Sequence, residues 1–599
     1  MFKQIKELLA HKSYAKAFEL LKASAGKDDD FIVQHKAASV WTNFPKELLD
    51  LKKIKIAVLS SSTTSHLIPV FDFWLAKNGL NAEIWESEYD TLEQTVIDPE
   101  SGLYLFKPDI VVILINYRDV EQGMEDRVAH YQGLGDLLQE RLKCFVIQSN
   151  VDVPLTRIMG NYETVFPGSK QNVLRNFNAR LVEAVKPGTT VFDLEYVAGM
   201  FGKKLWFDNR YWYHSKHAFN LEATGLVAFY LSRVIAGVKG LSKKCLVLDL
   251  DNTLWGGVIG DDGINGIILA NGSAGEAFVD FQKYLLGLKE RGIILAVCSK
   301  NEEENAQEPF IKHPEMILKL SDIAVFMANW NNKADNIKKI ADMLNIGLDS
   351  IVFIDDNPAE RDLVKEYLPL VTVVDLPEDP VDFIRALDEQ ALFETVAVLD
   401  EDLVRNDYYR DNVKRQDLQK QFTDISQYLK HLDMEAQVGS FDDINLPRIA
   451  QLINKSNQFH LTTTRYTESQ ISVMIADKKY ETLYFRLKDR FGDNGLIAAV
   501  ILRDQGEGGL FIDTWVMSCR VLSRGMEEFI FNSIIKLAKS KKFVILQGQY
   551  IPTKKNGLVA DLYSKMGMKL EREENGTIFW TLEVNQAEEK KAHIKTVTT

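Results

Sequence analysis

Residues 244–257 read KCLVLDLDNTLWGG, a short apolar run that ends in two aspartates, Asp249 and Asp251. An apolar run closed by a polar turn is typical of a strand that is buried on both faces of a parallel sheet. Because side chains at i and i+2 leave a strand on the same side, both carboxylates should emerge together at its carboxyl end. Ligand sites of open α/β sheets lie at that end, so the stretch predicts a site there.

Three more strand ends with polar residues follow downstream. Ser299 comes after IILAVC, and Lys333 opens a helix after NWNN. The pair Asp355 and Asp356 follows SIVFI. Either acidic pair alone is equally readable as a helix cap. Four signals in this order, beginning with DxDxT, resemble the motifs of the haloacid dehalogenase (HAD) superfamily.

The chemistry of phosphate esters gives each group a role. A carboxylate that attacks an anionic phosphoryl group needs a divalent cation, and Mg²⁺ prefers oxygen ligands. We therefore expect Asp249 to be the nucleophile and Asp251 to be the general acid and base. Ser299 and Lys333 are expected to donate to the non-bridging oxygens. The expected Mg²⁺ ligands are Asp249, the backbone carbonyl of Asp251, Asp355 and Asp356.

The spacing of these motifs predicts an open site. Only 48 positions separate Asp251 from Ser299, and 34 separate Ser299 from Lys333. Neither gap has room for a large cap domain beyond the hairpin-like segment WGGVIGDDGINGIIL. An open phosphatase site suits a phosphate that is carried on something bulky, such as a protein-bound thioester.

A narrower resemblance rests on DLDNTLWGGVIGDDG, VCSKN and FIDDNPAERD, which look like the FkbH-like branch, HAD subfamily IIIC. It covers most of the chain, because INKSNQFHLTT, DRFGDNG, WVMSCRVLSRGMEE and YIPTKKN are similar to the family's C-terminal part, with a GCN5-related N-acetyltransferase (GNAT) fold. Thr464 stands where that pattern has Arg. The resemblance implies that a phosphoglyceryl group from 1,3-bisphosphoglycerate loses its phosphate. The glyceryl unit is then loaded on an acyl carrier protein, whose phosphopantetheine arm is the co-substrate, in polyketide or surface-polysaccharide biosynthesis.

The loop CRVLSRGMEE follows a strand and opens a helix, so its amides and the helix dipole predict an anion site for a pantetheine phosphate. The expected contacts are Arg520, Arg524 and Gly525, although Ser523 replaces the first glycine of the acetyltransferase pattern. Cys519 adjoins Arg520, which makes it a candidate thioester nucleophile. The alternative is a small buried hydrophobic residue.

Three other residues have two interpretations each. Cys298 adjoins Ser299 but alternates toward the opposite face of its strand, so we expect a structural residue more than a nucleophile. His460 and Asn556 could position an acyl group, or could simply be hydrogen-bonded parts of the fold.

Residues 55–239 alternate strand-like and helical runs, which predicts βαβ units. They resemble an SGNH-hydrolase-like, flavodoxin-type fold. Its candidate polar residues are Ser60 to Ser62, Asn116 and Asn150. The family's DxxH is missing, because Tyr211 stands three places after Asp208 and both His214 and His217 are misplaced. We therefore expect docking or scaffolding rather than hydrolysis from this domain.

The length of 599 residues predicts several domains. The expected class is α/β multidomain: an SGNH-like parallel sheet, a HAD Rossmann-like domain without a large cap, and an α+β GNAT-like domain. The expected boundaries are 1–50 for an N-terminal helical segment, 51–239 for the SGNH-like domain, 240–380 for the HAD domain, 381–433 for a linker of surface helices, 434–584 for the GNAT-like domain and 585–599 for a mobile tail.

Composition narrows the functional classes. A net charge of −14 argues against non-specific nucleic-acid binding, since phosphate backbones need concentrated Lys and Arg. The N-terminal stretch has helical spacing and resembles neither a signal peptide nor a membrane span, so we expect a cytoplasmic protein without a membrane partner. The four cysteines are scattered singly and suggest neither zinc nor disulfides.

Three functions remain to be compared. The leading one is the glyceryl transferase and phosphatase that acts on a carrier protein. The second is a simple HAD phosphatase whose flanking domains only recruit substrate. The third is a scaffold without catalysis, which the intact acidic pairs disfavour.

Overall fold

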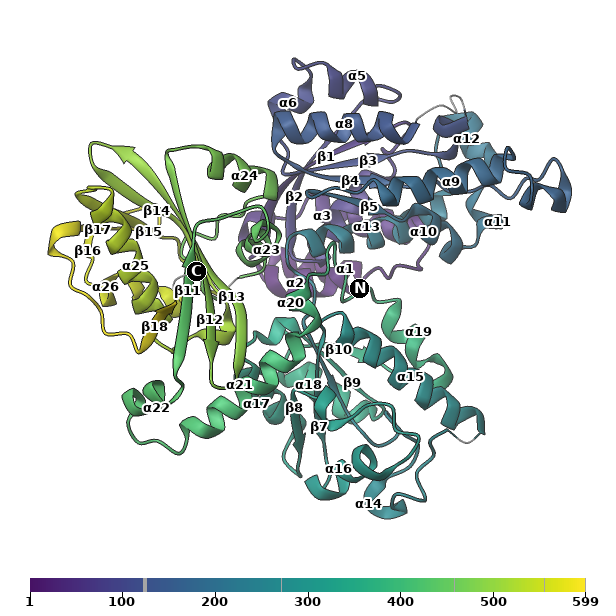
Figure 1. Ribbon diagram of the computed structural model, residues 1–599. Coiled ribbons are helices and arrows are strands. Elements are labelled where there is room, and N and C mark those ends of the chain that lie inside the picture. Colours follow the sequence, from purple (N-terminus) through teal and green to yellow (C-terminus); the bar gives the residue numbers. More distant parts are fainter. Residues whose placement is uncertain (122–126, 271, 457, 554, 598–599) are drawn as a thin grey trace. The chain divides into compact units, whose positions relative to one another are not determined.

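The computed structural model describes residues 1–597 except 122–126, 271, 457 and 554. It consists of two compact units (Figure 1). The first contains Met1–Leu241 and Thr467–Gln470, and the second contains Ser242–Tyr466 and Ile471–Thr599. The described residues form one five-stranded sheet in the first unit, and one five-stranded and one eight-stranded sheet in the second. The predicted α/β multidomain class is confirmed.

The first unit opens with three helices and continues as a parallel sheet of order β2-β1-β3-β4-β5. The helices are α1 (Phe2–Ala10), α2 (Tyr14–Lys22) and α3 (Phe31–Thr42). The strands are β1 (Lys52–Ser60), β2 (Leu80–Glu86), β3 (Ile110–Leu114), β4 (Phe145–Ser149) and β5 (Thr189–Phe192). Alternate residues of β1 and β3 pack under α8 (Arg127–Leu142) and α9 (Lys170–Glu183). Helix α4 (Leu67–Lys77) packs against α3 and α13 (Thr224–Val238).

Helix α13 belongs to a long apolar segment. By length and composition alone, the window Leu221–Val238 is the one helix among the described residues that could cross a membrane. Of that window, 72% is buried inside the first unit. Burial of this kind is what the core helix of a folded domain requires, and it accounts for the apolar sequence without a bilayer.

The second unit begins with a parallel sheet of order β10-β9-β6-β7-β8. Its strands are β6 (Cys245–Leu248), β7 (Ile294–Ser299), β8 (Val325–Ala328), β9 (Ile351–Asp355) and β10 (Thr372–Asp375). Helix α15 (Gly272–Glu290) covers one face, and α17 (Lys333–Leu344) covers the other. The central strand β6 pairs Leu248 with Ile354 of β9 and with Val297 of β7. This register brings the carboxyl ends of β6, β7 and β9 to one edge.

Between β6 and α15 the chain forms a small flap in place of a cap domain. The flap contains a bridge between Gly256 and Ile268 and the single turn α14 (Ile259–Asp262). Leu254, Trp255 and Ile259 are buried in the core of the sheet, whereas Val258 and Ile268 are exposed. The flap is therefore fixed to the domain and leaves the edge of the sheet uncapped, as the spacing predicted.

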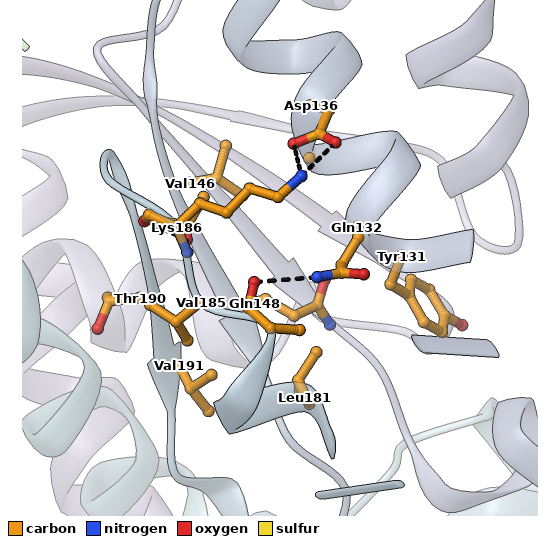
Figure 2. Close-up of a pocket in the computed structure, with 13 residues that line it drawn as sticks. Tyr131, Gln132, Asp136, Val146, Gln148, Leu181, Val185, Lys186, Thr190 and Val191 are labelled. Atoms are coloured by element: carbon orange, nitrogen blue, oxygen red, sulfur yellow. Dashed lines mark hydrogen bonds and ion pairs between the residues drawn. The ribbon is translucent and has the colours of Figure 1, made fainter. Parts of the chain in front are cut away.

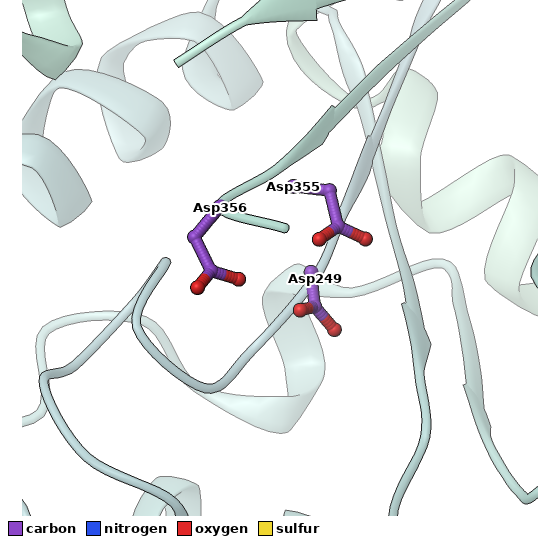
Figure 3. A group of neighbouring side chains, drawn as sticks. All are labelled: Asp249, Asp355 and Asp356. Atoms are coloured by element: carbon purple, nitrogen blue, oxygen red, sulfur yellow. The ribbon is translucent and has the colours of Figure 1, made fainter. Parts of the chain in front are cut away.

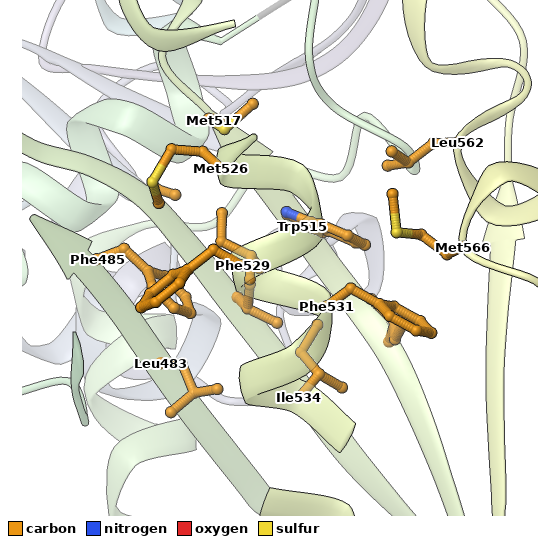
Figure 4. Close-up of a cluster of buried hydrophobic side chains, with 14 of the residues drawn as sticks. Leu483, Phe485, Trp515, Met517, Met526, Phe529, Phe531, Ile534, Leu562 and Met566 are labelled. Carbon is orange, nitrogen blue, oxygen red and sulfur yellow. The ribbon is translucent and has the colours of Figure 1, made fainter. Parts of the chain in front are cut away.

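The eight-stranded sheet has the order β16-β17-β15-β14-β13-β12-β11-β18. Its strands are β11 (Met434–Gly439), β12 (Tyr480–Asp489), β13 (Gly492–Gly506), β14 (Gly509–Met517), β15 (Ile545–Tyr550), β16 (Lys569–Glu574), β17 (Thr577–Glu583) and β18 (Ile594–Val597). Helix α25 (Met526–Ser540) lies on one face, where Phe529 and Phe531 pack near Phe485 and Trp515 (Figure 4). Helix α23 (Leu446–Lys455) covers the other face. This is the predicted α+β arrangement.

Two parts of the C-terminal half have more contacts than the sequence indicated. The tail 585–599 was expected to be mobile; within it, β18 pairs in parallel with β11, and Asn532 exchanges two hydrogen bonds with the backbone of Lys590. The segment 381–433 was expected to lie on the surface. Its helix α21 (Arg405–Gln419) buries Asn406, Asn412 and Arg415. Polar side chains are buried in this way where distant residues complete their hydrogen bonds.

Candidate metal and phosphoryl-transfer site

Three carboxylates converge at the carboxyl edge of the five-stranded sheet in the second unit (Figure 3). Asp249 directly follows β6, Asp355 is the last residue of β9, and Asp356 comes next. One oxygen from each lies within 4.8 Å of the others. Within the described residues, this is the one group of three His, Cys, Asp or Glu side chains that has metal-ligand spacing. The two strand ends thus meet as predicted.

Two of the three carboxylates are buried, and the three repel one another. Asp355 is fully buried and Asp249 is 6% exposed. Burial, followed by repulsion from Asp249, raises the pKa of Asp355 to about 7. The same two causes raise the pKa of Asp356. The cluster therefore holds its negative charge at a cost that a bound cation would remove.

Lys333 supplies one positive charge to this cluster. It is the first residue of α17, whose N-cap Asn332 accepts from the amide of Ala334. Its Nζ lies 2.9 Å from Asp249 Oδ1 and 2.6 Å from Asp355 Oδ2. Burial opposes the charge of this lysine, but the two aspartates outweigh burial and raise its pKa. Lys333 is therefore a fixed ammonium beside the expected nucleophile.

The donor set fits Mg²⁺. All three converging groups offer oxygen, which is the ligand that Mg²⁺ selects, and none offers sulfur or imidazole. Three carboxylates against one ammonium leave the cluster with an excess of negative charge, as a divalent cation requires. Asp249, Asp355 and Asp356 are the residues that would hold it.

The carboxylate of Asp251 lies outside the converging group and is held by the flap. Its Oδ1 accepts from Trp255 Nε1 at 2.9 Å and from the amide of Ile259 at 3.0 Å. Its Oδ2 accepts from Asn301 Nδ2 at 2.9 Å. This carboxylate is therefore oriented separately from the metal group, as an acid and base requires, and ligation by its backbone carbonyl stays a prediction.

Ser299 ends β7 at the same edge and is 2% exposed. Its Oγ accepts from Asn301 Nδ2 at 3.2 Å, so Asn301 links Ser299 to Asp251. Sequence reasoning missed Asn301, although its place two residues after Ser299 was a usable signal. It also missed Arg361, whose Nη1 donates to the backbone carbonyls of Asp355 and Asp356, both at 2.7 Å. Arg361 thereby fixes the turn that presents the acidic pair.

The two candidate cysteines have different surroundings. Cys298 is fully buried in the core between the sheet and α17, and burial raises the pKa of its thiol to about 12. Cys519 is partly exposed, and its Sγ lies 3.6 Å from Tyr409 Oη. Its backbone carbonyl accepts from Asn345 Nδ2 at 2.6 Å. Asn345 is the residue after α17, so Cys519 lies at the far end of the helix that begins with Lys333.

In the structure, the residues of the GNAT-like domain that were expected to contact a cofactor have other partners or roles. Arg524 is buried, and its guanidinium donates to Asp489, Asn494, Asn412 and the carbonyl of Arg520. Gly525 takes φ 79° as the N-cap of α25, a conformation that glycine adopts without strain.

Glu527 lies within the first turn of α25, and its carboxylate accepts from the amide of Ser523 at 3.2 Å. One amide of the expected phosphate loop is thus already bonded to a carboxylate of the chain itself. A second acid, Glu528, lies in the same turn. Both charges oppose an anionic ligand at this helix start.

Asn556 and His460 are hydrogen-bonded to the backbone of neighbouring loops. Asn556 is fully buried, donates to the carbonyls of His460 and Ile551 at 3.0 Å, and accepts from the amide of Thr553. The ring of His460 is within hydrogen-bond distance of the Thr464 carbonyl at 2.9 Å, and its Nδ1 accepts from Thr463 N at 3.0 Å. The hydrogen bonds that the structural interpretation predicts are therefore present at both His460 and Asn556.

In the first unit, the polar strand ends bond to one another. Ser61 Oγ donates to Asp119 Oδ2 and accepts from Asn116 Nδ2 at 3.1 Å. Asn150 donates to Asp193 at 2.7 Å. The remaining predicted serines, Ser60 and Ser62, pair through their hydroxyls at 3.1 Å.

Two histidines and Asp208 of that unit lie in other surroundings. The rings of His66 and His217 are tilted by 37° with centroids 4.2 Å apart, and neither ring nitrogen of buried His66 has a hydrogen-bond partner. Asp208 pairs with Arg210. These contacts differ from the acid, histidine and serine relay of an esterase.

A pocket of about 40 Å³ lies beside β4 and β5 of the first unit's sheet (Figure 2). It is lined by Val146 and Gln148 of β4 and by Thr189 and Val191 of β5, so it follows the length of both strands. Lys186, which also lines it, has an ion pair with Asp136 at 2.7 Å.

Comparisons with known proteins agree with this architecture. The model of the FkbH N-terminal domain matches residues 55–236. The N-terminal part of the protein BF1531 from Bacteroides fragilis, which contains a phosphatase domain and was crystallised with Mg, is 37% identical with a TM-score of 0.54. The match covers 63% of this chain and 99% of that one. No curated protein sequence matches.

Acetyltransferases resemble about a quarter of the chain. The ribosomal-protein-S18-alanine N-acetyltransferase from Escherichia coli is 13% identical, with a TM-score of 0.21, over 26% of this chain and 98% of that one. The IAA acetyltransferase from Bacillus cereus is 14% identical, with a TM-score of 0.19, over 25% and 99%. The matches to the FkbH domain and to BF1531 are the ones that identify the chain, which belongs to the FkbH-like family of proteins with a phosphatase domain.

Proposed function

We propose that this HAD-like phosphatase removes the phosphate from a phosphoglyceryl group derived from 1,3-bisphosphoglycerate, and that the glyceryl unit is loaded on the phosphopantetheine arm of an acyl carrier protein. The observation that carries the phosphatase part is the meeting of Asp249, Asp355 and Asp356 beside Lys333. The magnesium in the crystals of BF1531 supports Mg²⁺ as the cofactor. The glyceryl and carrier-protein parts rest on the family resemblance.

The proposed reaction has two steps at Asp249. Its carboxylate attacks phosphorus, the bond to the glyceryl oxygen breaks, and Asp251 donates a proton to that oxygen. Asp251 then takes a proton from water, the water attacks the aspartyl phosphate, and phosphate leaves with Asp249 regenerated. Bound Mg²⁺ would reduce the repulsion between Asp249 and the phosphoryl oxygens.

The other residues of the edge hold these groups in place. In this proposal Lys333 and Ser299 donate to the non-bridging oxygens, where negative charge develops. Asn301 and Trp255 orient the carboxylate of Asp251 from two sides. Orientation of this kind is worth several orders of magnitude in rate when reacting atoms are otherwise free to move.

The uncapped edge supports a bulky substrate. The flap around Gly256 and Ile268 lies between β6 and α15, and its residues Leu254, Trp255 and Ile259 are buried in the core. A phosphate carried on a protein-bound arm can reach such an edge without the opening of a lid.

Cys519 and Asp249 belong to different steps in this proposal. They lie toward opposite ends of α17, so a single small substrate does not touch both at once. A flexible carrier arm can visit the two ends in turn. A thioester at Cys519 therefore requires that the carrier arm moves the substrate between the Asp249 site and the thiol.

A simple phosphatase is the second candidate. The carboxylate of Glu527 at the start of α25, and the internal bonding of Arg524 and Asn556, both favour it because they leave fewer groups for acyl-donor binding. A scaffold without catalysis is disfavoured by the complete set of acidic groups around Lys333.

Intact-mass spectrometry separates the candidates. We expect incubation with 1,3-bisphosphoglycerate to give a glyceryl adduct on the wild-type chain, and an adduct heavier by one phosphate on Asp249→Asn, which cannot dephosphorylate it. The adduct should be absent from Cys519→Ala and should move to an added carrier protein from the wild type. Release of phosphate with no adduct on any variant would establish the simple phosphatase instead.

A further inference from the structure

A cluster of cations surrounds Cys519 in the second unit, and the proposed function does not use it. Its members come from four segments, since Arg448 and Lys455 both belong to α23. They are Lys244, Arg405, Arg448, Lys455 and Arg520. Lys244 directly precedes β6, so the cluster lies at the amino edge of the phosphatase sheet, opposite the acidic edge.

Direct contacts tie the cluster together around the thiol. Lys244 Nζ lies 3.5 Å from the carbonyl of Lys455. The guanidinium of Arg520 lies 4.3 Å from the ring centroid of Tyr408, and the next residue, Tyr409, contacts Cys519 Sγ through its hydroxyl. These contacts place Cys519 inside a basic surrounding.

The positive charge of the cluster exceeds its internal compensation. Arg405 has an ion pair with Asp402. Lys455 has a pKa lowered by burial first and then by three neighbouring cations, Arg405, Arg448 and Lys244. Burial, followed by Arg520, lowers the pKa of Arg448 to about 9. Of the nearby carboxylates, Asp349 pairs with Lys555 and Glu401 acts on Arg448. These three carboxylates face five cations, so the cluster keeps an excess of positive charge.

Two guanidinium nitrogens in this cluster are buried without a hydrogen-bond partner. They are Nη2 of Arg520, a residue only 6% exposed, and Nε of Arg448. An arginine does not relieve such a position by losing its proton at physiological pH. The other bonded nitrogens of these side chains have partners within the protein, since Arg520 Nε donates to Ser518 and Arg448 donates to Gln451 and to the carbonyl of Leu496. A buried donor without a partner is destabilising, and an anionic oxygen of a ligand would satisfy it.

We propose that these five residues form a second anion-binding site, which holds the phosphate group of a ligand next to the Cys519 thiol. Arginine recognises phosphate oxygens in pairs and lysine adds point charges, which is the combination present here. The site goes beyond the proposed function, because it needs neither the metal centre nor a particular phosphoglyceryl substrate.

Two lengths separate this site from the acidic edge. Strand β6 has four residues between Lys244 and Asp249 and spans about 13 Å. Helix α17 has 12 residues and spans about 18 Å from Lys333 toward Asn345. A phosphate held by Arg520 is therefore out of reach of Asp249. It anchors the ligand and presents the ligand's other end to the thiol.

Alkylation of Cys519 reports occupancy of this site. Cys519 is partly exposed whereas Cys144, Cys245 and Cys298 are buried, so iodoacetamide should label it selectively in the native protein. The experiment uses the full-length Asp249→Asn chain without divalent cations, and labelling is followed by peptide mass spectrometry. Inorganic phosphate at roughly ten times its Kd should slow labelling about tenfold, while chloride at equal ionic strength should not.

Phosphopantothenate, which lacks a thiol, distinguishes the two sources of the phosphate group. Protection at a lower concentration than inorganic phosphate would assign the site to a carrier-protein arm. Equal protection by the two would assign it to a free phosphorylated metabolite. Both outcomes support an anion site.

Substitutions within the cluster test whether its cations cause the protection by phosphate. Arg520→Gln and Lys455→Gln should each lose protection and still unfold cooperatively, and Lys455→Gln decides if Arg520→Gln does not fold. The matched control Lys536→Gln removes an exposed lysine from α25 and should keep protection. Labelling that phosphate does not slow would overturn the proposal, as would protection that survives both cluster variants and is lost in Ser299→Ala.

Discussion

The chain contains two five-stranded parallel sheets of similar build whose carboxyl edges differ in chemistry. In the first unit the strand ends carry Ser61 and Asn116, which bond to each other and to Asp119. In the second unit the corresponding edge carries Asp249 and Asp355, held by Lys333. The comparison shows that a parallel sheet supplies only the place for a site. The residues at the strand ends decide the reaction.

The two edges also differ in how their charge is balanced. Asp119 accepts from the hydroxyl of Ser61 and from the amide of Asn116, so its carboxylate is bonded by neutral donors within the unit. The three carboxylates of the second unit have one ammonium among them, and the pKa of Asp355 is raised to about 7. The acid at the first edge has its hydrogen bonds within the unit, whereas the three carboxylates at the second edge need a cation to balance their charge.

The largest effect is expected at the nucleophile. Asp249→Asn should lower phosphate release by roughly 10⁴-fold or more, because no other group can accept the phosphoryl unit. Release of p-nitrophenol from p-nitrophenyl phosphate measures this. The matched change Asp119→Asn at the other edge should leave turnover near wild type. Equal losses from both variants would mean that the two edges do not differ as described.

Metal dependence comes next in size. Chelation by EDTA should abolish phosphatase activity, and added Mg²⁺ should restore it. Asp356→Asn should raise the Mg²⁺ concentration for half-maximal activity about tenfold, or about 1.4 kcal/mol, since one oxygen ligand of the three loses its charge. Activity measured against free Mg²⁺ tests this, and an unchanged midpoint would remove Asp356 from the ligand set.

A smaller effect is expected at Asn301, which positions Asp251. Asn301→Ala should lower kcat roughly tenfold with little change in KM, because proton transfer depends on the orientation of that carboxylate. Steady-state kinetics separate the two parameters. A change in KM alone would indicate that Asn301 binds substrate instead.

An effect on stability, separate from these effects on activity, concerns a buried acid in the first unit that lies outside any metal-like cluster. Asp152 is 1% exposed, its Oδ2 accepts from Trp206 Nε1 at 2.6 Å, and burial raises its pKa from 3.8 to about 7. The folded state therefore binds the proton more tightly than the unfolded state does. Its contribution to stability falls as pH rises from about 4 to about 7 and is then constant.

Asp152→Asn keeps an acceptor for Trp206 and removes the buried charge. Its stability advantage over the wild type should grow across that pH range, at most by about 1.4 kcal/mol per pH unit. Thermal melting of both proteins at pH 5 and pH 8 measures the difference. An advantage that is the same at both values would show that Asp152 is ionised in the folded state throughout.

Sequence patterns predicted what lies close to a strand end. The i, i+2 spacing of Asp249 and Asp251 and the pair after SIVFI indicated the acidic edge, because strand direction alone brings such ends together. The different roles of Asp249 and Asp251 became clear only from their surroundings in the structure. The flap bonds Asp251 through Trp255 and Ile259, which no periodicity reveals.

Features that depend on distant partners were missed. The charged helix α21 was expected on the surface, but Arg415 finds Asp489, a residue 74 positions away, and is buried with it. The position of Cys519 was equally hidden, since it depends on Asn345 at the end of α17. A pattern of charged residues by itself predicts a helix exposed to solvent. Only the positions of the partner residues show that one face of α21 is buried.

The most direct test of the account is an anomalous difference map from crystals of this chain grown with Mn²⁺ in place of Mg²⁺. The account predicts one strong peak per chain, coordinated by oxygens of Asp249, Asp355 and Asp356 and adjacent to Lys333. A map with no peak at these three carboxylates, or with its strongest peak elsewhere in the chain, would contradict it.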